Sequence, residues 1–202
     1  KILSKKGIKS TIFPNLFSLE KVSSTHNKNS KVFIHVGELQ KRKGFVEFFN
    51  VVRKAPGHFF KVVGQPSGRS GFLFYEELKS LKNVKLLGRL SHTQTIKEIA
   101  DSTALLSTSP MEGFPNIFIE SWACGVPVIS LYVDPGGIIE KNDLGVVAHG
   151  KMDMLLNALN TVSSDDEFKS RSQAYVENNH VLNSKRIQEI DGLFKRLLDV
   201  PQ

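Results

Sequence analysis

Cysteine is almost absent from this 202-residue sequence, which contains only Cys124. A single cysteine excludes an internal disulfide framework and favours a reducing compartment. The six histidines are scattered, so no group of side chains has the spacing of a metal site, and we expect no bound metal. Cys124 stands just before Gly125, and we interpret it as a small buried side chain rather than a nucleophile.

Long apolar runs are also missing. No run approaches the roughly 18 residues of a membrane-spanning helix, and the first ten residues, KILSKKGIKS, contain no apolar segment of signal-peptide length. We therefore expect a cytoplasmic protein, and we leave open that the full-length protein binds peripherally to the inner face of a membrane. With 40% hydrophobic and 23% charged residues, the composition is that of a globular domain rather than a disordered chain.

Positive charge is in excess, and it is unevenly distributed. Residues 1–43 contain ten of the 27 Lys and Arg residues but two of the 20 acidic residues, a balance of +8 against +7 for the whole chain. This asymmetry indicates an anionic ligand or surface near that segment, with a solvated basic face as the alternative. Interleaved aromatic residues of the kind that bind nucleic acid are missing there, so we expect no nucleic-acid partner.

What the sequence does contain is a regular alternation of strand and helix patterns. It predicts an α/β fold with a Rossmann-like, doubly wound parallel sheet flanked by helices. We expect strands at 7–15, 31–36, 59–63, 83–87, 104–106, 126–131 and 146–147, and helices at 45–54, 72–81, 91–100, 116–124, 152–162, 165–181 and 184–198. Phe72, Leu73, Leu78 and Leu81 should face inward, and the apolar residues of the last helices should be core.

Residues 107–130 form the most informative stretch. A strand should end at Ser109-Pro110, a loop should carry Glu112, and a helix starting near Pro115-Asn116 should carry Glu120. A helix N-terminus is an anion site, and the two carboxylates could accept hydrogen bonds from hydroxyl groups of a ligand. Alternatively, both glutamates merely favour the helix dipole and face water, and on spacing alone this reading is the better supported.

The pattern E-G-F-x-N-x-x-x-E-x-x-A-x-G-x-P-V in that stretch resembles the donor-site signature of family 4 retaining glycosyltransferases, which have the two-domain GT-B fold. The resemblance implies that Glu120 binds the ribose of a nucleotide sugar. It also implies that Glu112, with Gly113, Phe114 and Asn116, contacts the transferred sugar and the diphosphate. Pro115 stands where many members have glycine, and proline has no N–H to donate.

The first strand and its loop resemble the VGRLxxxKG segment of the same family. Gly37 matches the first glycine, and Lys43 with Gly44 matches the KG pair, which implies that Lys43 binds the diphosphate. Glu38 stands in place of the family's arginine, a reversal of charge. Either Arg42 or Lys41 compensates for this reversal, or the phosphate site is weaker than is usual in the family.

The resemblance also assigns donor contacts to two further loops. The family binds its nucleobase to main chain just after the third strand, which points to Arg89 and Leu90. Its GG-x-x-E loop lies beside the donor phosphates or sugar, which points to Gly136 and Gly137, although an ordinary tight turn would explain these glycines almost as well.

The resemblance runs from about Gly7 to the last helix and corresponds to the C-terminal half of a GT-B enzyme. It implies that residues 1–202 form a nucleotide-sugar-binding domain, with the helices at about 165–200 packing as a C-terminal tail and the N-terminal acceptor domain missing. The implied function is donor binding in a retaining enzyme of polysaccharide biosynthesis that transfers a hexosyl group to a glycan or lipid-linked acceptor. Glu112 and Lys43 would be its catalytic residues here.

Partners and alternatives follow from the same resemblance. The expected partners are a nucleotide-diphosphate sugar and the missing domain, with no cofactor and no metal, and this chain alone should be inactive. The alternatives are a nucleotide-sugar epimerase of the same fold and a non-catalytic binding module, for which Glu38 and Pro115 would be signs of a decayed site. A sugar phosphorylase would need a pyridoxal lysine, for which we find no site. An NAD-dependent oxidoreductase fails for want of G-x-G-x-x-G after the first strand.

Overall fold

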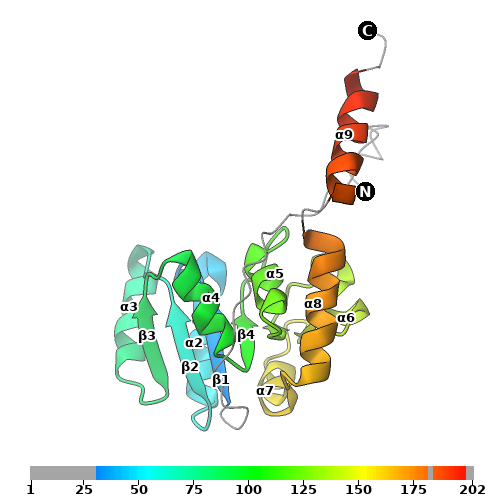
Figure 1. The fold of residues 1–202 in the computed structure, drawn as a ribbon. Helices are drawn as coiled ribbons and strands as arrows, with labels where there is room; N and C mark the ends of the chain where they lie inside the picture. The colour runs from blue at the N-terminus through cyan, green and yellow to red at the C-terminus, as the bar shows by residue number, and fades with distance from the viewer. Residues whose placement is uncertain (1–30, 182–183, 199–202) are drawn as a thin grey trace.

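The fold is described by a computed structural model covering residues 31–181 and 184–198 (Figure 1). The strand expected at 7–15 lies outside these residues. The elements follow the predicted alternation, in the order β1 Val32–Val36, η1 Lys41–Lys43, α2 Phe45–Lys54, β2 Phe59–Val63, α3 Gly68–Lys79, β3 Val84–Gly88, α4 His92–Ala100, β4 Ala104–Ser107, α5 Asn116–Ala123, β5 Val128–Ser130, η2 Pro135–Gly137, α6 Ile138–Lys141, β6 Gly145–Val147, α7 Met152–Thr161, α8 Asp166–His180 and α9 Ser184–Leu198.

Within the described residues, six strands form one parallel sheet in the order β3-β2-β1-β4-β5-β6. The predicted doubly wound α/β fold is therefore confirmed. The chain first builds outward from β1 through β2 to β3, and then returns to place β4 on the other side of β1. Ile34 of β1 is paired with Leu105 of β4. In such sheets, ligands bind in the crevice at the carboxyl ends of the two strands where the order reverses, here β1 and β4.

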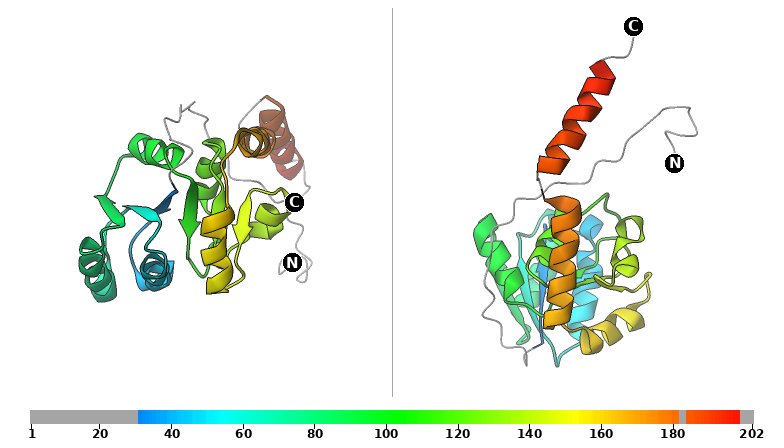
Figure 2. Two further views of the ribbon diagram at one scale, coloured as in Figure 1. Left: turned by 90° about the horizontal axis from the view of Figure 1, so that it is seen from below. Right: turned by 45° about the vertical axis from the view of Figure 1, so that its right-hand side comes forward.

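Helices cover both faces of the sheet (Figure 2). One face packs on α2, α3 and α7, where Phe33 and Phe60 of the sheet meet Phe45 and Phe48 of α2. The other face packs on α4, α5, α6 and α8 around Trp122, which is fully buried and donates a hydrogen bond from Nε1 to the Leu144 carbonyl at 2.9 Å. Burial on both faces explains why the strands read as short apolar runs rather than as an alternating pattern.

Helix α3 corrects one prediction. It begins at Gly68 instead of Phe72, so its inward face is not the expected one. Leu78 is buried as predicted, but Phe72 and Leu73 are 56% and 60% exposed, and Phe74 and Tyr75 pack against the core in their place. Residues three or four positions apart share a helix face, so Phe74 and Tyr75 lie on the side of Leu78, whereas Phe72 and Leu73, six and five positions before it, do not.

The last two helices behave differently from each other. Helix α8 packs on α5, with the ring of Tyr175 edge-on to Trp122 at 5.6 Å between centroids. Helix α9 projects beyond the sheet (Figure 1), and Ile187 and Phe194 are 53% and 61% exposed. The prediction that the apolar residues of α9 are core is therefore wrong for these two. No helix among the described residues combines the length and hydropathy that crossing a bilayer would require.

Candidate functional site

A cavity of about 260 Å³ opens at the carboxyl ends of β1 and β4, at the point where the strand order reverses. This volume is slightly below the roughly 300–1,000 Å³ of typical ligand pockets, so it fits part of a ligand. Residues from β1, η1, β4, the following loop and the start of α5 line it, namely His35, Val36, Gly37, Lys43, Leu105, Leu106, Ser107, Ser109, Glu112, Pro115, Asn116, Ile117 and Phe118. Of the predicted site residues, Gly37, Lys43, Glu112 and Asn116 lie together here.

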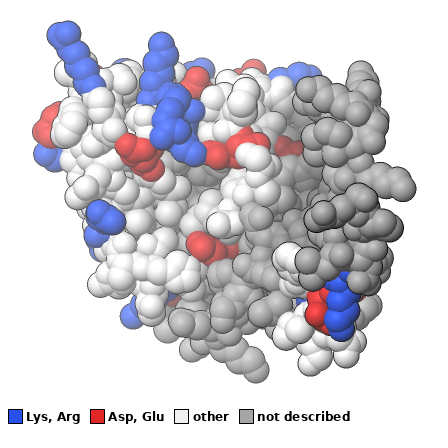
Figure 3. Space-filling view, turned by 90° about the horizontal axis from the view of Figure 1, so that it is seen from above, with Lys and Arg blue, Asp and Glu red and all other residues white. Residues whose placement is uncertain are grey.

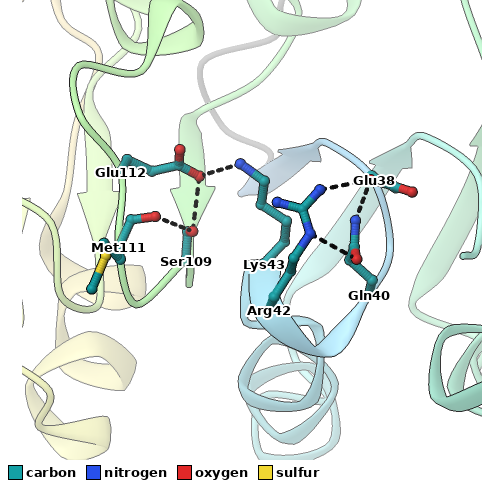
Figure 4. Close-up of polar contacts among 7 residues, drawn as sticks. All are labelled: Glu38, Gln40, Arg42, Lys43, Ser109, Met111 and Glu112. Carbon is teal, nitrogen blue, oxygen red and sulfur yellow. Dashed lines mark hydrogen bonds and ion pairs between the residues drawn. The ribbon is translucent and has the colours of Figure 1, made fainter. Parts of the chain in front are cut away.

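Lys43 and Glu112 face each other across the cavity mouth (Figure 4). The Lys43 Nζ donates to Glu112 Oε1 at 2.7 Å, and Ser109 Oγ donates to the same oxygen at 2.8 Å. Burial opposes ionisation of Glu112, but the hydrogen bonds from Lys43 and Ser109 and the positive charges of Lys43 and Arg42 hold its pKa below the ordinary value. Glu112 and Lys43, which the resemblance assigned to the sugar and the diphosphate, are thus preorganised as an ion pair.

The two loops that carry Lys43 and Glu112 are in direct contact at Gly44 and Thr108. Thr108 Oγ1 donates to the Gly44 carbonyl at 2.8 Å, and a Cβ atom on Gly44 would lie 1.8 Å from the Thr108 carbonyl oxygen. Gly44 also has a left-handed φ of 73°, which glycine adopts without strain. The glycine of the Lys43-Gly44 pair therefore allows the β1 loop to approach the β4 loop closely enough for Lys43 to reach Glu112.

Glu38 and Arg42 form a second ion pair on the rim. Arg42 Nη2 lies 3.3 Å from Glu38 Oε2 and its Nε donates to Gln40 Oε1 at 2.9 Å, while Gln40 also bonds to Glu38 (Figure 4). The side chains of Arg42 and Glu38 are 68% and 45% exposed, so the attraction between their charges is largely screened by water. Seen from above, basic and acidic side chains lie close to one another over the upper left of the described surface (Figure 3). Glu38 thus pairs with one of the two cations that were expected to compensate for it.

Helix α5 starts at the cavity. Its first residue is Asn116 and its N-cap is Pro115, so the helix starts where the sequence predicted. Pro115, Asn116, Ile117 and Phe118 all line the cavity, which places the positive end of the helix dipole there. At the other end of the helix, Gly125 has the left-handed φ of 74° expected of a C-terminal stop.

Glu120 lies one helical turn further along α5, outside the cavity lining. Its side chain is 14% exposed, and His92 Nε2, at the start of α4, lies 3.2 Å from its Oε1. The His92 side chain is 62% exposed, and nothing in the sequence indicated its contact with Glu120. Helix α4, which carries His92, is capped by Ser91, which forms a complete capping box with Gln94.

His35 is the polar residue that sequence analysis overlooked. It lies in the middle of β1, is 5% exposed, and its ring packs on Phe48 at 4.6 Å between centroids. Its Nδ1 lies 3.3 Å from the Leu106 carbonyl oxygen of β4. Burial lowers the pKa of His35 from 6.5 to about 4, and the hydrogen bond to Leu106 only partly opposes this shift. The available signal was a histidine within an otherwise apolar strand, two residues before its glycine.

The remaining predicted site residues do not line this cavity. Arg89 is exposed and Leu90 packs on the core, both after β3. Gly136 and Gly137 have left-handed φ values of 70° and 74° in η2, as a tight turn requires. Gly113 follows Glu112, and the ring of Phe114 packs on His180 at 5.3 Å between centroids. Their donor contacts stay predictions.

The described residues offer little for metal or thiol chemistry. The described part of the chain contains no group of three or more His, Cys, Asp or Glu side chains that could hold a metal ion. Cys124 is buried, and burial together with the charge of Glu120 raises the pKa of its thiol to about 12. A thiol with so high a pKa is a poor nucleophile, as the sequence predicted.

The fold and the cavity together define an α/β domain with a ligand crevice at the switch point of a doubly wound sheet. Residues 17–179 match the family model "Glycosyl transferases group 1". The chain belongs to this family, and the resemblance seen in the sequence is confirmed. A curated relative, the uncharacterized glycosyltransferase MJ1059 of Methanocaldococcus jannaschii, is 28% identical over 138 residues, which are 60% of this chain and 34% of that protein.

Solved structures share the fold. A sucrose-phosphate synthase from Thermosynechococcus elongatus matches with a TM-score of 0.77 at 17% identity over 97% of this chain and 55% of that one. A mutant of S. aureus TarM in complex with UDP, alpha-GlcNAc-glycerol and Fondaparinux matches with a TM-score of 0.75 at 20% identity, over 93% of this chain and 40% of that one. This chain thus spans about a third to about a half of the length of these relatives.

A prediction follows for pH. Because the pKa of His35 is lower in the folded state than in the unfolded state, the unfolded chain binds more protons between pH 6.5 and 4. The free energy of unfolding should therefore be unaffected above pH 6.5 and should fall by about 3 kcal/mol as the pH drops to 4. Urea titrations should show a shallower loss for His35→Asn, which has no proton to gain. If the free energy of unfolding falls equally with pH in the wild type and in His35→Asn, the lowered pKa of His35 is contradicted.

Proposed function

We propose that this chain is the donor-binding domain of a retaining glycosyltransferase and binds a nucleotide-diphosphate sugar in the cavity at β1 and β4. The observation that carries the proposal is the placement of Lys43, Glu112 and the start of α5 around one cavity at the switch point. Lys43 and the helix N-terminus suit a diphosphate, and Glu112 suits sugar hydroxyls. Relatives of this fold crystallised with UDP, or with UDP and glucose, support a nucleotide sugar as the ligand.

The chemistry proposed for the site is electrostatic. When the glycosidic bond of the donor breaks, negative charge develops on the diphosphate leaving group. Lys43 and the positive end of α5 would stabilise that charge from fixed positions, without a metal ion. Glu112 would hold the sugar, and Glu120 would accept hydrogen bonds from the ribose hydroxyls. We further propose that the whole protein transfers a hexosyl group with retention to a glycan or lipid-linked acceptor in polysaccharide biosynthesis, in the cytoplasm or at the inner face of its membrane.

One observation favours a second candidate, a binding module without catalysis. Arg42 is paired with Glu38 on the rim of the cavity, so the cation expected to replace the family's arginine is already partly neutralised. A diphosphate held by fewer cations binds more weakly and is a poorer leaving group. The binding experiment below applies to both candidates. Sugar transfer by the whole protein would support the enzyme, and donor binding without transfer by the whole protein would support the binding module.

Binding is tested by calorimetry with UDP-glucose, UDP-N-acetylglucosamine and GDP-mannose, and with the matching diphosphates and nucleosides. We expect at least one nucleotide sugar to bind. Lys43→Ala should weaken diphosphate binding by about 1–3 kcal/mol, as for a lost charged hydrogen bond, and should leave nucleoside binding nearly unchanged. Lys54→Ala is the control, since this exposed lysine ends the same βα unit at the opposite edge of the sheet. An unchanged ratio of diphosphate to nucleoside affinity in Lys43→Ala would argue against the phosphate role.

Glu120 tests the ribose assignment separately. Glu120→Ala should weaken the binding of UDP or GDP by about 1–3 kcal/mol, because two ribose hydroxyls would lose a charged acceptor. Folding should be nearly intact, since the carboxylate's partner in the structure is the exposed His92. Glu77→Ala on α3 removes the same charge far from the cavity and should have no effect on affinity. If Glu120→Ala binds as tightly as the wild type, the ribose lies elsewhere.

Transfer requires an acceptor held in register with the donor and enclosure that excludes water. The cavity supplies one wall of such a site, on a chain that spans at most about half of its structural relatives described above. We therefore expect the 202 residues alone to bind the donor and to transfer no sugar above background, measured as release of UDP or GDP with a panel of acceptors. Measurable transfer by this chain would contradict the proposal that it binds only the donor and that the acceptor is bound elsewhere in the whole protein.

A further inference from the structure

The floor of the cavity contains a polar atom that the proposed donor site has not used. His35 lines the cavity together with Lys43 and Leu106, and it is 5% exposed, whereas the Lys43 side chain is 31% exposed. Its Nε2 atom has no hydrogen-bond partner among the described residues. A buried nitrogen without a partner costs free energy, so an atom of this kind at a ligand cavity points to a ligand contact.

The orientation of the ring is fixed by its neighbours. Nδ1 lies 3.3 Å from the Leu106 carbonyl oxygen, and the ring packs on Phe48 and, at 6.4 Å between centroids, on Phe45. Nε2 is directed to the other side, toward Gly37 at the carboxyl end of β1, where a Cβ atom would lie 3.9 Å from it. Gly37 thus leaves the approach to Nε2 free of a side chain.

The same contact decides which proton the ring carries. A carbonyl oxygen can only accept, so Nδ1 must hold the proton that it donates to Leu106. With its pKa near 4, the imidazole is neutral at physiological pH, and Nε2 is left as an acceptor with a lone pair. Such an atom can be satisfied by a hydroxyl or an N–H group. It repels phosphate and carboxylate oxygens, which carry no proton at that pH.

We propose that Nε2 of His35 accepts a hydrogen bond from a hydroxyl or amide group on the sugar of the bound donor and thereby helps to select the sugar. The inference rests on the proposed donor-binding function and deepens it. The cavity is then divided by chemistry. Lys43 and the start of α5 bind the phosphates at the mouth. His35 accepts a hydrogen bond from a hydroxyl or amide group of the sugar at the floor. His35 acts with Glu112, whose carboxylate likewise accepts hydrogen bonds from hydroxyl groups.

The test compares each nucleotide sugar with its own diphosphate, UDP-glucose with UDP and GDP-mannose with GDP, by calorimetry. In His35→Asn the side-chain amide can still donate to Leu106, but nothing occupies the Nε2 position. The ratio of sugar-nucleotide to diphosphate affinity should fall about 3- to 10-fold, as for one lost hydrogen bond, while diphosphate affinity stays within about twofold. His35→Gln, whose longer amide reaches the Nε2 position, should recover part of the ratio.

Controls separate this role from a structural one. His58→Asn changes the other histidine that has a buried ring nitrogen without a partner among the described residues, just before β2, and should leave the ratio unchanged. If His35→Asn does not fold, His35→Leu fills the apolar floor without either ring nitrogen and should give the same loss. An unchanged ratio, or an equal loss for sugar nucleotide and diphosphate, would overturn the inference and leave the proposed function standing. Failure of the wild type to bind any of the four probes would overturn both.

Discussion

Strand β1 pairs with β2 on one side and with β4 on the other, and the cavity depends on this double pairing. Connections between neighbouring parallel strands are right-handed, so building outward from β1 in both directions sends the crossover helices to opposite faces of the sheet. The loops after β1 and β4 consequently turn away from each other and leave a crevice between them. Gly44, with its backbone against Thr108, then brings the two loops close at one point, and this is the point from which Lys43 reaches Glu112.

Charge is arranged around this crevice in two pairs with different surroundings. Lys43 and Glu112 are partly buried, so their attraction is only partly screened and their side chains are held in place. Arg42 and Glu38 are largely exposed and contribute little to stability. A ligand anion therefore meets a partly buried Lys43 paired with Glu112 at the cavity and an exposed Arg42 paired with Glu38 on the rim. This difference gives Lys43 the larger part in the proposed phosphate site.

The sequence was sufficient for the fold because its signals are local. Runs such as FFKVV and the amphipathic period of α2 determine their own structure, and α2 and β2 have the predicted limits. It was insufficient where burial depends on what lies opposite, as for Phe72 on α3 and Phe194 on α9. Lys43 and Glu112 were each identified through a resemblance, but their contact spans 69 positions and required coordinates. His35 was missed because its partner, the Leu106 carbonyl, lies 71 positions away.

The reversal of strand order also bears on the sequence of events during synthesis. The cavity takes its walls from β1 and from residues as far along as Phe118 of α5, although β2, α3, β3 and α4 lie between them in the chain. A polypeptide growing from its N-terminus can pair β1 with β2 and β2 with β3 early, since these contacts are near in sequence. It cannot complete the cavity until Phe118 has left the ribosome. Competence to hold a ligand therefore requires both the docking of β4 beside β1 and the formation of the first turn of α5.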